Sequence, residues 1–163
     1  MEILVVYYSK SGNTAKLAEE VGKGVQEVEG AVCRLKSVEE VANDDFVSAS
    51  GIIAGSPVYY GSMAAELKAV FDRLLPVRKK MGNKVGAAFC TSGHHTGGKE
   101  TTMLSILQAM LINGMVVVGD ALDASGHYGA ACSGTPDAVT ASVARKLGKR
   151  VAQLARSLHT SAE

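Results

Sequence analysis

The sequence has 163 residues, a formal net charge of +1 and 47% hydrophobic residues, which fits one globular domain with a buried core. No apolar run approaches the roughly 20 residues that a membrane-spanning helix requires. The near-zero charge gives no field that would attract nucleic acid or an anionic membrane. The N-terminus shows no signal-peptide pattern, and three cysteines without C-x-x-C spacing fit reduced thiols. We therefore expect a cytoplasmic protein, and we interpret Cys33 and Cys90 as small core residues.

Strand and helix patterns alternate along the chain. Continuous apolar runs, typical of strands covered on both faces, predict strands at residues 3–8, 31–35, 50–55, 85–90 and 115–118. Apolar residues at helical spacing predict helices after the first, third, fourth and fifth strands. The expected buried stripes are Leu17, Val21, Val25 and Val28; Met63, Leu67, Val70, Phe71 and Leu74; Met103, Leu107, Met110 and Leu111; and Val139, Val143, Leu147, Val151, Leu154 and Leu158.

This alternation predicts an α/β fold with a doubly wound, five-stranded parallel sheet and helices on both faces. Thr135-Pro136 opens the last predicted helix, with proline in its first turn. The polar segment around residues 43–45 has too few apolar residues to predict a helix. We expect residues 159–163 to be a frayed tail.

The first strand and the first helix are joined by Ser9, Lys10, Ser11, Gly12, Asn13 and Thr14. A short polar loop before a helix presents free backbone N–H groups and the positive end of the helix dipole, which favour a phosphate. The loop lacks both G-x-x-x-x-G-K-[ST] and G-x-G-x-x-G, so a single monophosphate suits it better than a triphosphate or a pyrophosphate. The alternative is an ordinary helix start capped by a side chain.

Two further loops follow the third and fourth strands, and they should face the same edge of the sheet as the first. One contains Pro57, Val58, Tyr59, Tyr60 and Gly61, and the other contains Thr91, Ser92, Gly93, His94, His95, Thr96 and Gly97. Paired aromatic rings suit a flat ligand, and a glycine-rich polar loop can bond the edge of its ring. Adjacent histidines are poorly spaced to share one metal ion, so we interpret His94 and His95 as polar residues at the rim of the site.

Four short motifs occur in order along the chain. They are Tyr8-Ser9 with Gly12; Ser56-Pro57 with Tyr60-Gly61 and Met63; Phe89 through Thr91-Ser92-Gly93 to Gly97-Gly98 and Glu100; and Gly126-His127-Tyr128-Gly129-Ala130. With these motifs the sequence resembles the flavodoxin-like superfamily of FMN-binding proteins over nearly its whole length. Within that superfamily it is most similar to the WrbA type of NAD(P)H:quinone oxidoreductase.

The resemblance implies a flavodoxin-like three-layer fold with strand order 2-1-3-4-5 and a single FMN-binding domain over residues 1–163. Residues 9–14 would bind the FMN phosphate, residues 57–61 would flank the ribityl chain and isoalloxazine, and residues 91–97 would contact both. The sequence departs from the WrbA group in two places. It is short after the second strand, where that group carries an insertion that helps build a site shared in a tetramer, and Asn113 stands where the group usually has a histidine at the flavin.

The function that the resemblance implies is electron transfer through FMN from NAD(P)H to a quinone or similar acceptor, in a homodimer or homotetramer. The cofactor carries this chemistry, so we name no catalytic residue; Tyr59 or Tyr128 would hold planar partners by stacking. The alternative is a flavodoxin-type carrier that docks to a redox protein. Such carriers are typically strongly acidic, so the near-neutral charge favours the enzyme. A scaffold of the same fold without flavin is the third hypothesis.

Overall fold

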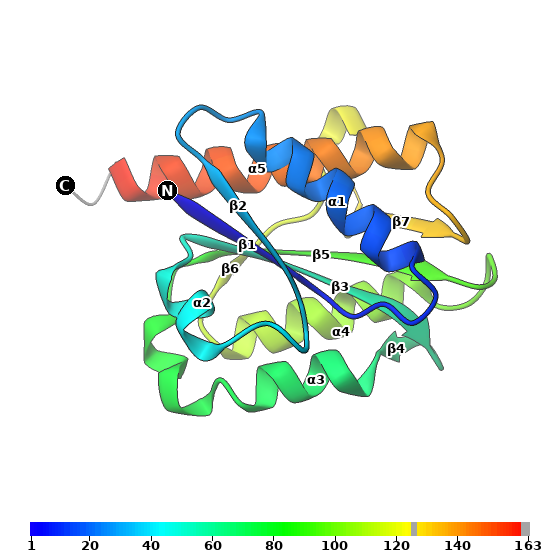
Figure 1. The fold of residues 1–163 in the computed structure, drawn as a ribbon, viewed down its shortest axis with the longest axis horizontal. Helices are drawn as coiled ribbons and strands as arrows, with labels where there is room; N and C mark the ends of the chain where they lie inside the picture. The colour runs from blue at the N-terminus through cyan, green and yellow to red at the C-terminus, as the bar shows by residue number, and fades with distance from the viewer. Residues whose placement is uncertain (125–126, 161–163) are drawn as a thin grey trace.

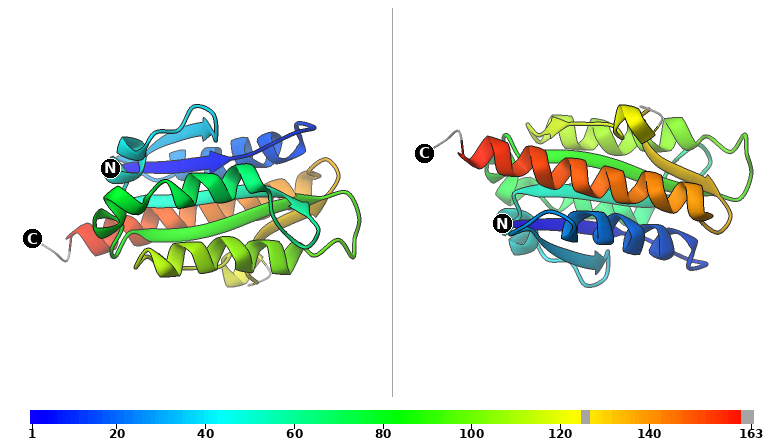
Figure 2. Two further views of the ribbon diagram at one scale, coloured as in Figure 1. Left: turned by 90° about the horizontal axis from the view of Figure 1, so that it is seen from below. Right: turned by 90° about the horizontal axis from the view of Figure 1, so that it is seen from above.

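The computed structural model describes residues 1–124 and 127–160, which form three layers (Figure 1). The strands are β1 (Glu2–Tyr7), β2 (Val32–Ser37), β3 (Gly51–Tyr59), β4 (Ser62–Met63), β5 (Val85–Ser92), β6 (Val116–Val117) and β7 (Gly129–Ser133). The helices are α1 (Asn13–Gln26), α2 (Asn43–Ser48), α3 (Ala65–Asp72), α4 (Lys99–Ile112) and α5 (Ala138–Thr160), with 3-10 helices η1 (Leu75–Lys80) and η2 (Leu122–Ala124). Helices α1 and α5 cover one face of the sheet, and α3 and α4 cover the other (Figure 2).

The strand order β2-β1-β3-β5-β6 confirms the predicted order 2-1-3-4-5, but the predicted count of five strands is wrong. The short β4 runs antiparallel to the end of β3, and β7 runs parallel to β5 beyond the point where β6 ends. The fifth position of the sheet is therefore built from two segments. The sequence signal for β7 is weak because Gly-Ala-Ala-Cys-Ser contains none of the β-branched or aromatic residues that favour strands.

Each face of the sheet carries its own buried core. In β1, Leu4 and Val6 join the cluster under α3 and α4, whereas Ile3 and Val5 join the cluster under α1 and α5. All eight residues of β5 are buried, as its continuous apolar pattern predicts.

The segment around residues 43–45, for which no helix is predicted, forms the short helix α2. The Asp45 carboxylate accepts a hydrogen bond from the Ala42 N–H at 2.8 Å, and Phe46 is fully buried under the helix. One aromatic anchor and one capping carboxylate therefore replace the apolar stripe that longer helices show.

The predicted start of the last helix is wrong by a few residues. Helix α5 begins at Ala138, and the Asp137 carboxylate caps it by accepting the Thr140 N–H at 2.7 Å, so Thr135 and Pro136 precede the helix. The helix continues to Thr160, and residues 161–163 of the expected tail lie outside the described residues. Among the described residues, no helix is both long and apolar enough to cross a membrane.

Four members of the expected buried stripes are placed differently. Val139 and Leu158 on α5 and Leu111 on α4 are 72%, 46% and 57% exposed, and each lies in the first or last turn of its helix. Met63 lies in β4 and not on a helix. The small residues Ala144, Ala152 and Ala155 complete the buried face of α5.

Two glycines allow α1 and α5 to pack closely. A methyl group at Gly148 of α5 would overlap the carbonyl oxygen of Val21, and one at Gly24 of α1 would overlap the carbonyl oxygen of Arg145. The two helix backbones are therefore in direct contact, which fixes the position of α1 over the sheet.

We predict that Gly148→Ala lowers the free energy of unfolding by about 2 kcal/mol, because the methyl group forces the two helices apart. Helix propensity alone would raise it by ~1 kcal/mol. Urea unfolding followed by circular dichroism distinguishes the two signs. Gly82→Ala is the matched control, since a methyl group there has only the Lys79 carbonyl oxygen 4.0 Å away; a stabilised Gly148→Ala variant would contradict the close helix contact.

Candidate functional site

The three predicted loops meet at the carboxyl ends of β1, β3 and β5. The hydroxyl oxygens of Thr14, after β1, and Thr91, at the end of β5, lie 2.8 Å apart in a buried hydrogen bond. A methyl group at Gly98 would come within 2.8 Å of the Gly61 Cα atom, so the turn after β3 touches the start of α4. The structure thus brings together loops that are up to 80 residues apart in the sequence, as the sheet topology predicts.

The first loop leaves the start of α1 without a side-chain cap among the described residues. Gly12 stands at the N-cap position with a φ of 89°, in the left-handed region that favours glycine. The Ser9 hydroxyl accepts the Gly12 N–H at 3.1 Å, which folds the loop back on itself. The backbone N–H groups of the first helical turn are therefore open to an anion, and the alternative of a side-chain-capped helix start does not hold.

The second loop is a β-hairpin, whereas the sequence predicts that the third strand ends at residue 55. Strand β3 extends through Pro57, Val58 and Tyr59, and a two-residue turn at Tyr60 and Gly61 leads into β4. Both turn residues have positive φ values, 51° and 76°, as hairpins with two-residue turns require.

Tyr60 is an uncommon residue for such a turn. A non-glycine residue with positive φ carries backbone strain, and the ring of Tyr60 is fully exposed, so burial does not offset that strain. The predicted ligand contact of Tyr60 stays a prediction.

A cluster that sequence reasoning missed lies behind this hairpin. The Tyr8 and Tyr59 rings meet edge to face with centroids 6.4 Å apart. A hydrogen bond to Glu66, in the first turn of α3, together with burial and the negative charge of Glu66, raises the pKa of Tyr8 to about 12. Tyr8 therefore stays neutral and braces Tyr59; the signal in the sequence was the position of Tyr8 directly after β1.

The third loop consists of Gly93 to Gly97, because Thr91 and Ser92 still belong to β5. The Ser92 hydroxyl donates to the His94 carbonyl at 2.7 Å, and Nδ1 of His94 accepts the Thr96 N–H at 3.3 Å. The side chains of His94 and His95 are exposed and their rings pack edge to face, which places them at the rim of the site. Across residues 1–124 and 127–160, no three His, Cys, Asp or Glu residues are grouped to hold a metal ion.

The thiols of Cys33 and Cys90 are core groups. Cys90 is fully buried, and burial raises the pKa of its thiol to about 12; burial also raises the pKa of Cys33 to about 11. Thiols with raised pKa values form little of the reactive thiolate. Both side chains pack with the cores, which confirms their interpretation as small core residues.

Asn113 and the fourth motif, both of which bear on the sequence resemblance, lie outside the three loops. Asn113 sits after the C-terminal end of α4, where its side-chain amide donates to the Ala109 carbonyl at 2.7 Å. In the fourth motif, Gly126 lies outside the described residues, Tyr128 is 45% exposed, and Gly129 begins β7.

Comparison with known proteins agrees with this geometry. Residues 1–129 match the model of a family described as NADPH-dependent FMN reductase. The chain belongs to this family. It is 34% identical over 187 residues to an NAD(P)H dehydrogenase (quinone) from Archaeoglobus fulgidus, covering 96% of this chain and 98% of that protein. It is 36% identical over 159 residues to a flavodoxin from Aquifex aeolicus, covering 93% and 85%.

The fold also resembles that of solved flavodoxin structures. A WrbA-like flavodoxin from Agrobacterium tumefaciens superposes with a TM-score of 0.81 at 25% identity, covering 96% of this chain and 98% of that one. Family membership and this likeness confirm the predicted flavodoxin-like fold, the predicted cofactor FMN and the class of flavin oxidoreductase. The individual FMN contacts at residues 9–14, 57–61 and 91–97 stay predictions.

We predict that Glu66→Gln lowers the pKa of Tyr8 from about 12 toward its ordinary value of 10, because the variant removes the charged acceptor that favours neutral tyrosine. In the unchanged protein the stabilising contribution of this bond is present below pH 10 and is lost between about pH 10 and 12. Ultraviolet titration of the tyrosines measures the shift, and Tyr8→Phe identifies the group. Glu39→Gln is the control, because Glu39 makes the smallest contribution to this pKa; an equal shift in both variants would contradict the assignment.

Proposed function

We propose that this protein is an FMN-dependent oxidoreductase that takes electrons from NAD(P)H and passes them to a quinone or a similar acceptor. The observation that carries the proposal is the convergence of three chemically different loops at one edge of the sheet, in a chain of the NADPH-dependent FMN reductase family. One loop offers N–H and hydroxyl groups, one offers aromatic rings and one offers a polar backbone.

The first loop fits the phosphate of FMN. The uncapped start of α1 offers backbone N–H groups with a positive dipole, and Ser11 adds an exposed hydroxyl. The Thr14 hydroxyl is hydrogen-bonded to Thr91 and so ties the first loop to β5. The backbone N–H of Thr14 stays available to the phosphate. The Ser9 side chain keeps Gly12 turned toward the same place.

The second and third loops fit the two sides of a flat ring. Tyr59 and Tyr60 present aromatic surface at the hairpin, and Gly98, which directly follows the third loop, lies against Gly61. Bound FMN supplies the transfer of two electrons and a proton as a hydride equivalent. The protein's part is to hold the ring edge, to orient a planar partner against it by stacking, and to leave one face open for donor and acceptor in turn.

A flavodoxin-type carrier is the second candidate, because one relative at 36% identity is named a flavodoxin. The net charge of +1 offers no strong field for steering to a basic redox protein. The enzyme therefore remains the better supported function, and the acceptor is a small molecule.

The cysteines and the sequence resemblance bear on location and assembly. The three free cysteines Cys33, Cys90 and Cys132 fit a reducing compartment, so we propose the cytoplasm. Assembly into a dimer or tetramer rests on the sequence resemblance alone, and light scattering after size-exclusion chromatography measures it.

We predict that NADH or NADPH, added without oxygen, bleaches the flavin absorbance of the FMN-loaded protein within the mixing time. A benzoquinone should then restore this absorbance. Stopped-flow spectra measure both halves. A flavin that only dithionite reduces, with a semiquinone that accumulates, would establish the carrier. Failure to retain any flavin would overturn the site.

We predict that Ser11→Asp weakens FMN binding at least tenfold and leaves riboflavin binding unchanged, because the new carboxylate repels the phosphate and riboflavin has none. Fluorescence quenching of each flavin gives the two dissociation constants. Ser142→Asp, an exposed serine on α5, is the matched control. Equal weakening of both flavins by Ser11→Asp would place the phosphate elsewhere.

A further inference from the structure

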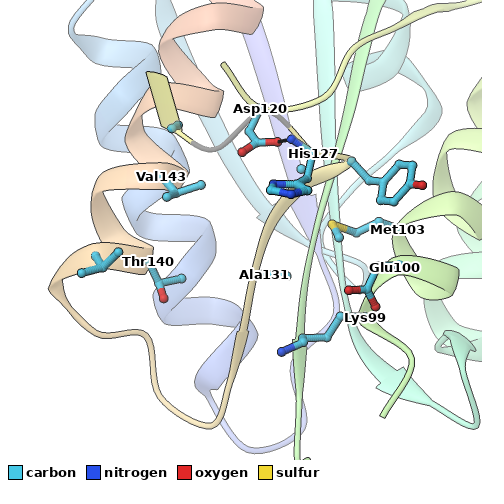
Figure 3. Close-up of a pocket in the computed structure, with 12 residues that line it drawn as sticks. Lys99, Glu100, Met103, Asp120, His127, Ala131, Thr140 and Val143 are labelled. Carbon is cyan, nitrogen blue, oxygen red and sulfur yellow. Dashed lines mark hydrogen bonds between the residues drawn. The ribbon is translucent and has the colours of Figure 1, made fainter. Parts of the chain in front are cut away.

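A cavity of about 310 Å³ lies beside the flavin site, at the open edge of the sheet (Figure 3). Thr140 and Val143 of α5 line one side, and Lys99, Glu100 and Met103 of α4 line the other (Figure 3). The floor is β7, and Asp120 and Ala124 lie at the far end. Nothing in the function proposed above uses this cavity.

The floor of the cavity presents unpaired backbone groups. In β7 the Gly134 N–H bonds the Ser92 carbonyl of β5, and backbone groups alternate along a strand. The N–H and C=O groups of Ala131 therefore point away from β5, into the cavity that Ala131 lines. None of the described strands pairs with this edge, so one donor and one acceptor are free for a ligand.

The far end of the cavity holds a buried carboxylate. Asp120 is 3% exposed, and one of its oxygens accepts the His127 N–H at 2.5 Å. Arg150 bonds the backbone carbonyl of Asp120 and not its carboxylate. Among the described residues, His127 is the only hydrogen-bond donor to this carboxylate. Asp120 lines the cavity, and its carboxylate can accept a further hydrogen bond from a donor group on a ligand.

These groups select a ligand class. The carboxylates of Asp120 and Glu100 accept hydrogen bonds and repel a quinone, whose oxygens are acceptors only. The Ala131 edge needs a ligand with a donor beside an acceptor. Met103, Val143 and Ala124 give apolar walls for a flat ring. Adenine meets all these requirements, because its amino group donates, its ring nitrogens accept and its faces are apolar.

The cavity is connected to the flavin site by hydrogen bonds. Lys99 donates to the Ser133 hydroxyl at 3.3 Å, and Ser133 lies 3.1 Å from the Ser92 hydroxyl, which bonds the third loop at His94. Lys99 follows Gly97 by two residues, which limits their separation to about 7 Å. The Lys99 ammonium group therefore lies between the cavity and the flavin site, where the phosphates of a ligand that spans both would pass.

We infer that this cavity binds the adenine half of the nicotinamide dinucleotide, while the nicotinamide end lies against the flavin. The amino group of adenine bonds Asp120, its ring nitrogen accepts from the Ala131 N–H, and Lys99 neutralises the phosphates. This assignment rests on the proposed function, because that function supplies the dinucleotide as electron donor. It adds a subsite that makes the full dinucleotide a better donor than its nicotinamide half.

The test compares NADH with reduced nicotinamide mononucleotide, the donor that lacks the adenosine half. Stopped-flow reduction of the FMN-loaded protein gives an apparent dissociation constant and a limiting rate for each donor. In Asp120→Asn the amide oxygen still accepts the His127 N–H, but the amide nitrogen turns a donor toward the amino group of adenine. We expect this variant to raise the constant for NADH about tenfold with an unchanged limiting rate, and to leave the mononucleotide unaffected.

Two further variants secure the result. Asp123→Asn, on the neighbouring η2, removes a 72% exposed carboxylate that is ion-paired with Lys146 and should change neither donor. Thr140→Phe fills the cavity without touching Asp120 and should reproduce the loss for NADH alone. AMP should compete with NADH in the unchanged protein and not in Thr140→Phe.

Failure of the adenine site and failure of the proposed function give different results. If both donors reduce the flavin equally well, or if Asp120→Asn slows both equally, the cavity does not bind adenine and the inference is overturned while the proposed function stands. If neither donor reduces the flavin, the proposed function fails. Calorimetric titration with AMP then tests the cavity by itself. Binding heat in the unchanged protein that is lost in Thr140→Phe supports an adenine site. No binding heat in the unchanged protein overturns the inference.

Discussion

The parallel pairing of β3 with β5 determines where every part of the site lies. The two strands stay in register from Gly51 opposite Val85 to Pro57 opposite Thr91. The Phe89 ring lies directly against Gly55, where any Cβ atom would overlap it. A slip of one residue would drive this ring into a side chain and would turn every residue of a fully buried strand to the opposite face. The register is therefore strongly specified, and it places Thr91 within hydrogen-bond distance of Thr14 in the first turn of α1.

The polar groups at this edge hold one another in place before any ligand binds. The Ser56 hydroxyl accepts the Ala64 N–H at 2.8 Å and donates to the Pro57 carbonyl at 2.7 Å, which ties β3 to the start of α3. Thr91 and Ser92 are buried and bonded in the same way. Because buried hydroxyls with satisfied partners keep their orientation, the surrounding loops are pre-organised, and less of the binding free energy is lost to ordering them.

Patterns that depend on burial could be predicted from the sequence, whereas features that depend on pairing could not. Continuous apolar runs located β1, β3 and β5, because each is covered on both faces. The extension of β3 to Tyr59 was missed because Ser56 and Pro57 look like a loop until β5 supplies their partners. Likewise, Val139 matches the helical period of α5 but lies in the first turn of the helix, where it lines the open cavity beside β7 and is 72% exposed. The three loops were located by position along the chain, but the Tyr8–Glu66 bond joins segments whose contact no local pattern encodes.

The division of the fifth strand has consequences for the kind of partner that the protein can accept. An unbroken strand beside β5 would leave a long free edge, which tends to pair with other chains. Here β6 has two residues and β7 has five. Residues 119–123, which follow β6, are held against α5 by Arg150, which donates to the Gly119 and Asp120 carbonyls, and by the Lys146–Asp123 ion pair at 2.9 Å. The remaining edge is walled by α4 and α5, so it is too short for strand addition, yet it keeps its backbone donor and acceptor facing a 310 Å³ space. A small molecule can use such an edge, whereas a strand of another chain cannot extend the sheet there.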